Sequence, residues 1–106
     1  MAGDQLFIGL DSGTQGTKAI VLSRQKGRIL AQANAPHGII ENERGGREQD
    51  PHWWTDACKL ALEKVLGNRA VDRKLVKAVS VSGQQHGMVP LDAEGAVIRP
   101  AKLWCD

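Results

Sequence analysis

Apolar residues in the first third of the chain fall in short runs that are separated by polar turns. The run Leu6–Leu10 is almost continuously apolar and precedes a stretch of Ser, Gly and Thr, which predicts a buried strand that ends at a loop. Thr17–Ser23 predicts a second strand, and Arg28–Asn34 a third and weaker one because alanine dilutes it. The connections are too short for crossover helices, so we expect an antiparallel meander.

A helical pattern follows a polar segment, His37–Gln49, which we predict to be an irregular loop. Asp50 is a suitable N-cap and Pro51 a suitable first helical residue, and the predicted helix ends before Gly67. Such a helix can carry the chain across the sheet to Lys77–Ser82, a fourth strand expected to run parallel to the first.

Two further short strands are predicted near the end of the chain. They are Met88–Leu91 and Val97–Ile98, on either side of the turn at residues 92–95. The predicted order is therefore β-β-β-α-β-β-β. This order indicates an α/β fold with a mixed sheet.

The composition of the chain argues against several classes of function. The chain has 106 residues, of which 42% are hydrophobic and 25% charged, with a formal net charge of +2. Its basic residues are scattered, so we expect no nucleic-acid partner, and no apolar stretch approaches the length of a membrane span. The first residues lack the pattern of a secretory signal, and two distant cysteines, Cys58 and Cys105, make no disulfide framework. The expected compartment is the cytoplasm.

The segment between the first two predicted strands has the residue types that bind a phosphate. Its candidates for binding a nucleotide are Asp11, Gly13, Thr14, Gln15, Gly16, Thr17 and Lys18. Gly13 and Gly16 can adopt positive φ, and successive N–H groups of such a turn form a nest for an anion. Thr14 and Thr17 add hydroxyl donors, and Lys18 adds a positive charge.

Asp11 has a place beside a phosphate only if a metal ion lies between them. Mg²⁺ keeps several waters and takes one or two carboxylates together with phosphate oxygens, so we expect Asp11 to bind it, through water. The spacing fits neither a Walker loop nor a dinucleotide-binding fingerprint. The pattern alone leaves open a glycine-rich hairpin with a polar tip and no ligand.

A second group of candidates follows the fourth predicted strand. Gln84, Gln85 and His86 offer the donors and acceptors that hydroxyl groups require, and Trp104 and Asp106 combine an apolar ring face with a carboxylate, as in sugar sites. His86 could instead be a surface or capping histidine, and Trp104 could fill the core.

Two polar residues at the start of the predicted helix could also contact a ligand. Gln49 is a further candidate contact for a ligand, whereas Asp50 is better explained as the helix cap.

Four segments, in this order, resemble the FGGY carbohydrate kinases and, within them, the xylulokinases. They are Ile8–Lys18, Glu48–Trp54, Ser82–Gly87 and Pro100–Asp106. The resemblance implies a ribonuclease-H-like, actin-like ATPase fold and an ATP- and Mg²⁺-dependent kinase that phosphorylates the terminal hydroxyl of an open-chain ketose such as D-xylulose.

The resemblance also implies roles for single residues. Asp11 would help to hold Mg²⁺, the bend after it would bind phosphate, and Gln84 and His86 fall where xylulokinases contact their sugar. Trp104 and Asp106 fall on the substrate-facing Trp-x-Asp motif of the family. Many xylulokinases carry methionine where this chain has Gln85, which leaves the identity of the sugar open.

Members of this family are several times longer than this chain. Their catalytic aspartate, second phosphate loop and adenosine pocket lie beyond residue 106. We therefore expect residues 1–106 to be an incomplete N-terminal domain that is inactive alone. The alternatives are a free-standing module that binds a nucleotide or phosphate, and a non-catalytic assembly piece. A truncated domain would leave apolar sheet surface uncovered, so we expect a homo-oligomer.

Overall fold

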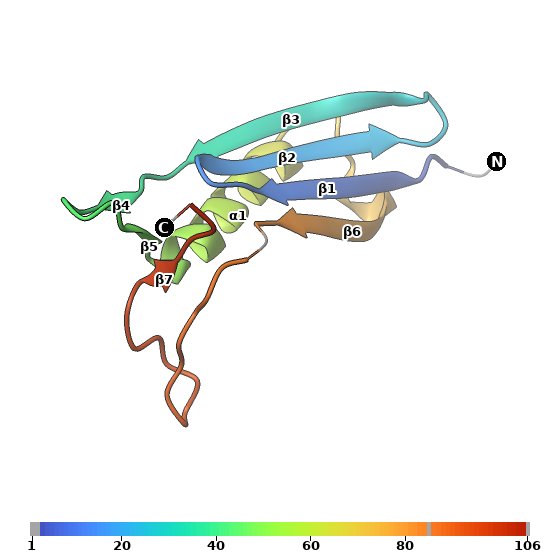
Figure 1. Cartoon of the computed structure of the whole chain (residues 1–106). Coiled ribbons are helices and arrows are strands. Elements are labelled where there is room, and N and C mark those ends of the chain that lie inside the picture. Colours follow the sequence, from blue (N-terminus) through green and yellow to red (C-terminus); the bar gives the residue numbers. More distant parts are fainter. Residues whose placement is uncertain (1–2, 85, 106) are drawn as a thin grey trace.

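The computed structural model describes residues 3–84 and 86–105. A four-stranded sheet, with one helix packed on one of its faces, forms the main body, and a small three-stranded sheet lies at one end (Figure 1). The elements are β1 Leu6–Ser12, β2 Gly16–Ser23, β3 Arg28–Pro36, β4 Ile40–Glu41, β5 Arg47–Gln49, α1 Pro51–Leu66, the 3-10 helix η1 Arg73–Leu75, β6 Val76–Gly83 and β7 Ala101–Lys102. Within the described residues, no helix has the length and apolar character needed to cross a membrane.

The main sheet has the strand order β3-β2-β1-β6 and is mixed. β1 pairs antiparallel with β2, and β2 antiparallel with β3, which confirms the predicted meander. After α1 and η1 the chain returns as β6, which runs parallel to β1 with Ile8 beside Val79 and Leu10 beside Val81. The predicted parallel strand is thus confirmed, and β6 forms one edge of the sheet.

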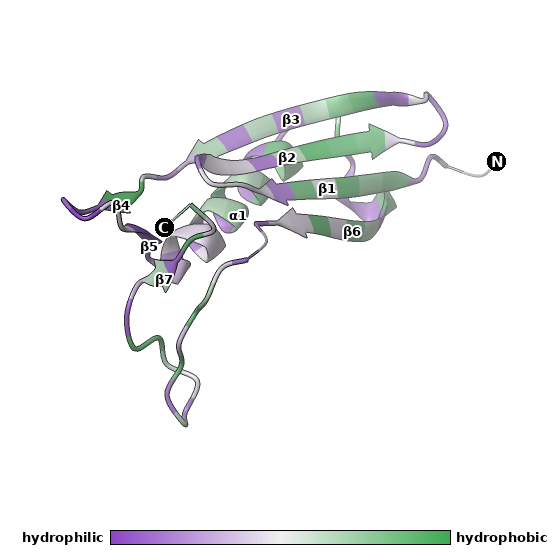
Figure 2. Ribbon diagram, in the orientation of Figure 1, coloured by the Kyte–Doolittle hydropathy of each residue, from purple (hydrophilic) through white to green (hydrophobic). Residues whose placement is uncertain are grey.

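The core lies between the sheet and α1, where alternate side chains of each strand point toward the helix. Figure 2 shows the apolar stretches of β1 and β2 running side by side across the middle of the sheet. The fully or almost fully buried apolar residues of this core are Leu6, Ile8, Leu10, Ala19, Val21, Ala31, Ala35, Ala57, Ala61, Val65 and Val71. Small alanines on both surfaces let the helix approach the sheet closely.

The start and end of α1 agree with the sequence. The Asp50 side chain accepts a hydrogen bond from the His52 N–H at 2.9 Å, so it caps one of the unpaired N–H groups of the first turn. Pro51 is the first helical residue, and the helix ends at Leu66, where Gly67 is the C-cap.

Two predictions about the other segments are wrong in detail. The region His37–Gln49 is not an irregular loop throughout, because it contains β4 and β5, and β5 pairs with the distant β7. The predicted strands at residues 88–91 and 97–98 are reduced to the isolated bridges Met88↔Lys102 and Leu91↔Val97. These residues form an excursion that extends away from the sheet, so they lack the neighbouring strands that would extend a ladder (Figure 1).

Candidate functional site

The bend between β1 and β2 lies at the end of the main sheet. It is closed by a hydrogen bond from the Gly13 N–H to the Gly16 carbonyl at 2.9 Å. Asp11 and Lys18 face each other across the two strands just below the bend, and both side chains are exposed. The N–H groups of Thr14 and Gln15 have no hydrogen-bond partner among the described residues, so two donors remain for an anion.

The glycines of the bend have a different role from the one predicted. Positive φ among the described glycines occurs at Gly27, Gly45 and Gly95, and therefore not at Gly13 or Gly16. Gly16 is needed because the backbones of β2 and β3 approach each other closely at this residue. A Cβ there would lie 2.8 Å from the Ala35 carbonyl oxygen on β3. The Gly13 N–H is already bonded within the hairpin, so it is not a free member of an anion nest.

The prediction that Thr17 lines the phosphate loop is wrong. Its side chain is fully buried on the face of the sheet that α1 covers, and its hydroxyl lies 4.0 Å from the Cys58 sulfur. Thr17 lies two residues before Ala19 in β2, and the alternation of a strand puts both on the same face. The Thr17 side chain therefore packs in the core beneath the bend, and its hydroxyl is not available to a ligand.

The second predicted group meets the bend through side-chain hydrogen bonds. The Thr14 hydroxyl donates to Gln84 Oε1 at 3.1 Å, and the Trp104 indole N–H donates to the Thr14 hydroxyl at 3.0 Å. Trp104 is 58% exposed, which rules out the alternative that it fills the core. Gln85 and Asp106, also predicted to contact the sugar, lie outside the described residues.

His86 is exposed and has an unusual backbone conformation. Its φ of 58° lies in the left-handed region, which non-glycine residues seldom adopt and which costs conformational energy. The described part of the chain has no other non-glycine residue with positive φ. His86 and Gln84 line the same cavity.

One open cavity of about 380 Å³ joins the two predicted groups. It is lined by Asp11, Ser12, Gly13, Thr14, Gly83, Gln84, His86 and Trp104. An adjoining cavity of about 300 Å³ shares Gln84 and His86 and adds Trp54 and Leu103. Carboxylate, backbone, amide, imidazole and indole groups thus surround one space, although they come from segments that are 70 to 90 residues apart in sequence.

Lys18 does not line the cavity at the bend but lines a second cavity. Together with Asp11 it borders a cavity of about 380 Å³ on the face of the sheet opposite α1. Asp11 is therefore common to the cavity at the bend and the cavity beside Lys18.

The residues present fit a Mg²⁺ ion that is held mostly by water and phosphate. Among the described residues, no group of three or more His, Cys, Asp or Glu side chains could hold a metal ion. Asp11 is the one carboxylate among the described residues that line the cavity at the bend, and the exposure of its side chain leaves room for the waters that Mg²⁺ retains.

Gln49 has surroundings that differ from those of the predicted ligand contact. Its side chain is fully buried beneath the bend, so it cannot contact a ligand. It accepts a hydrogen bond from the Trp54 indole N–H at 2.8 Å and one from Gln84 Nε2 at 3.0 Å. No local pattern reveals this role, because Gln49 and its partners come from different parts of the chain.

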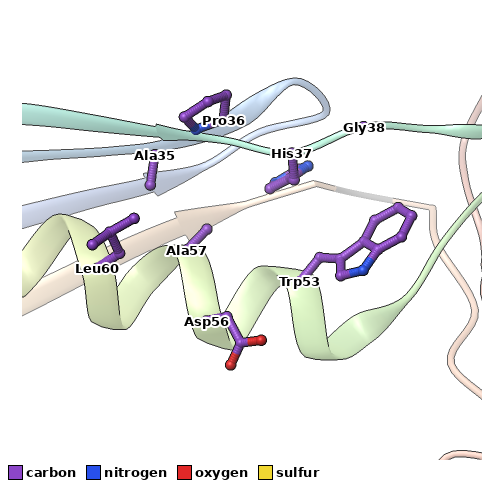
Figure 3. Close-up of a pocket in the computed structure, with 8 residues that line it drawn as sticks. All are labelled: Ala35, Pro36, His37, Gly38, Trp53, Asp56, Ala57 and Leu60. Atoms are coloured by element: carbon purple, nitrogen blue, oxygen red, sulfur yellow. The ribbon is translucent and has the colours of Figure 1, made fainter.

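A separate cavity lies on the other side of Gln49, between the end of β3 and α1. Figure 3 shows the rings of His37 and Trp53 facing this space of about 330 Å³, with Leu60 further along the helix. Burial lowers the pKa of the His37 imidazole, and a hydrogen bond with the Gly38 backbone partly opposes the shift. His37 Nε2 is buried and has no hydrogen-bond partner among the described residues.

Comparison with known proteins agrees with the fold. Residues 6–106 match the N-terminal domain of the FGGY family of carbohydrate kinases. The xylulose kinase of Haemophilus influenzae is 42% identical over 105 residues, an alignment that covers 95% of this chain and 21% of that protein. A xyloylose kinase from Brucella ovis superposes with a TM-score of 0.88 at 33% identity, over 96% of this chain and 21% of that one. A gluconate kinase from Lactobacillus acidophilus superposes with a TM-score of 0.87 at 25% identity, over 98% and 20%.

The mixed sheet and its helix are therefore part of a domain with the actin-like ATPase fold. The chain belongs to the FGGY family of carbohydrate kinases. It spans about a fifth of the length of the relatives described above.

Proposed function

We propose that this chain is the N-terminal part of an ATP-dependent kinase that phosphorylates the terminal hydroxyl of an open-chain ketose such as D-xylulose. The observation that carries the proposal is the single cavity of about 380 Å³ that has Asp11 and the bend on one side and Gln84, His86 and Trp104 on the other. Phosphoryl transfer depends mainly on holding phosphate and acceptor hydroxyl together and on neutralising charge, and a cavity of this kind serves both needs.

On the phosphate side, the free N–H groups of Thr14 and Gln15 would donate to phosphate oxygens, and Lys18 would add a positive charge at the neighbouring face of the sheet. Asp11 would hold Mg²⁺, in part through water. When bound, Mg²⁺ neutralises charge on the phosphates of ATP and helps to orient them.

On the sugar side, the amide of Gln84 and the imidazole of His86 would hydrogen-bond to hydroxyl groups, and the ring face of Trp104 would pack against C–H groups. Gln85 and Asp106 stay predictions at this side. None of the carboxylates in this chain is assigned as the base that accepts the proton of the attacking hydroxyl. The chain provides one wall of a cleft, and we expect no turnover from it alone.

The proposal is tested with a chimera in which residues 6–106 replace the matching segment of the Haemophilus influenzae xylulose kinase. We expect the chimera to phosphorylate D-xylulose with ATP, and the isolated chain to be inactive and to bind ATP at best in the millimolar range. A folded chimera that phosphorylates no ketose or polyol would refute the proposal. Nanomolar binding of a nucleotide by the isolated chain would favour a free-standing binding module instead.

A further inference from the structure

Gln49, at the end of β5, is the centre of a buried hydrogen-bond network. Its Nε2 donates to the Thr14 carbonyl at 2.6 Å and to the Gly38 carbonyl at 2.8 Å. Its Oε1 accepts from the Trp54 indole N–H at 2.8 Å and from Gln84 Nε2 at 3.0 Å. A single side chain with 0% exposure therefore joins the bend, the start of α1 and the segment after β6.

The partners fix which end of the amide faces which way. An indole N–H can only donate, so the atom that faces Trp54 must be the oxygen, and backbone carbonyls can only accept, so the atom that faces Thr14 must be the nitrogen. No other side chain of this size offers two donors and an acceptor on one planar group. A carboxylate would direct an oxygen at two carbonyls, and an aliphatic side chain would leave several buried polar groups without partners.

The two residues that Gln49 links also contact each other. Gln84 Nε2 donates to the Gly13 carbonyl at 3.3 Å, and the Thr14 hydroxyl donates to Gln84 Oε1 at 3.1 Å. These bonds connect two loops that leave the sheet from different strands. Gln49 lies beneath this junction and is shielded from solvent, so it can set the spacing of the two loops without touching a ligand.

We propose that Gln49 is a positioning residue that holds the phosphate-side bend and the sugar-side Gln84 at a fixed separation. The link between the loops is a property of this chain. What the link aligns, a nucleotide phosphate and a sugar hydroxyl, rests on the function proposed above. Displacements of about 1 Å in such a site can reduce a rate by about a hundredfold.

The link is tested first by NMR on the 106-residue chain. Gln49→Met keeps the length of the side chain and removes its hydrogen bonds, and Gln32→Met is the control because Gln32 is exposed on β3. We expect Gln49→Met to shift the indole N–H resonance of Trp104, which Gln49 does not contact but which shares Thr14 with it. The control should leave this resonance unchanged.

A shift confined to the direct partners Trp54 and Gly38 would overturn the proposal. If Gln49→Met does not fold, Gln49→Glu replaces it, because glutamate keeps the shape and both acceptor contacts and puts an oxygen in place of the donors to Thr14 and Gly38. The amides of Ala19 and Val21 in the core report whether either variant is folded.

The consequence for the reaction is tested by kinetics in the chimera. We expect Gln49→Met to lower kcat, normalised to folded protein, by about tenfold to a hundredfold, and to change the KM for xylulose and for ATP less than it changes kcat. A purely structural role would reduce the amount of folded enzyme and leave kcat per folded molecule unchanged.

Failure of the positioning role of Gln49 can be distinguished from failure of the proposed function. An active chimera whose normalised kcat is unaffected by Gln49→Met would overturn the positioning role and leave the proposed function intact. An inactive but folded parent chimera would contradict the proposed function, and the NMR comparison would still decide whether Gln49 links the loops.

Discussion

Gly16 occupies a position where the backbones of β2 and β3 come too close for any side chain. A Cβ at this residue would lie 2.8 Å from the Ala35 oxygen and 3.0 Å from the Cα of Pro36. Both are backbone atoms in a paired strand, so they cannot move aside cheaply. Gly13, three residues earlier in the same bend, would place a Cβ 3.6 Å from its nearest neighbour, which is an ordinary contact.

This contrast gives a prediction at the level of one residue. Gly16→Ala should lower the free energy of unfolding by about 1–3 kcal/mol, because the added methyl group forces apart two strands. Gly13→Ala is the matched control and should change the free energy of unfolding by less than about 0.5 kcal/mol. Urea unfolding of the three proteins measures both values. Equal effects of the two substitutions would contradict the assigned role of Gly16.

At the same scale, the sequence identified the residue types of the site better than their roles. The cluster around Asp11 was found because carboxylate, glycine and hydroxyl residues follow a strand directly. The buried position of Thr17 is predictable from the sequence, since the alternation of β2 puts it on the same buried face as Ala19 and Val21. The role of Gln49 depends on partners from four separate segments, which no local pattern contains.

Among the strands of the main sheet, β6 is the one that neighbouring elements cover least. It lies at an edge of the main sheet, and α1 packs mainly on β2 and β3. Val79 and Val81 lie beside the buried Ile8 and Leu10 of β1, and yet they are 52% and 63% exposed. An unpaired edge next to exposed valines is a surface on which chains associate.

We therefore expect the isolated chain to form dimers or larger species at tens of micromolar, as sedimentation equilibrium would measure. Val81→Lys should shift this equilibrium toward monomer, because a charge would be buried at the contact. Ile98→Lys is the control, since Ile98 is also 63% exposed but lies in the excursion away from the sheet. A monomeric parent chain, or equal effects of the two lysine substitutions, would contradict the prediction that chains associate through β6.

The long elements could be predicted because each carries its own signal. Continuous or alternating apolar residues marked β1, β2 and β3, and the Asp50–Pro51 cap marked the start of α1. The strands β4, β5 and β7 contain two or three residues each and exist through pairing with distant segments, so their short sequences carry no period to detect. Residues 88–98 have a strand-like composition but form isolated bridges and not a continuous ladder.

As a whole, the molecule is less compact than a self-contained domain of its length. Its radius of gyration is 16.5 Å, compared with about 13 Å expected for 106 residues. The extended shape, the uncovered edge at β6 and the projecting excursion agree with a chain that spans about a fifth of relatives such as the Haemophilus influenzae xylulose kinase. Under the proposed function the chain would contribute one wall of a cleft, and the cavity shared by the bend and Gln84 would be the part of that wall that faces the substrates.

In the proposed function, the carboxylate of Asp11 serves the phosphate side of this cavity together with Mg²⁺. The most direct test measures the Mg²⁺ dependence of D-xylulose phosphorylation by the active chimera with Asp11→Asn, with Asp56→Asn on the exposed face of α1 as the control. We predict that Asp11→Asn lowers kcat/KM for ATP by at least about tenfold and raises the Mg²⁺ concentration needed for half-maximal rate, since Asp11 is the one carboxylate among the described residues that line this cavity. The control should behave as the parent does, and an Asp11→Asn chimera with unchanged rate and Mg²⁺ dependence would contradict the account.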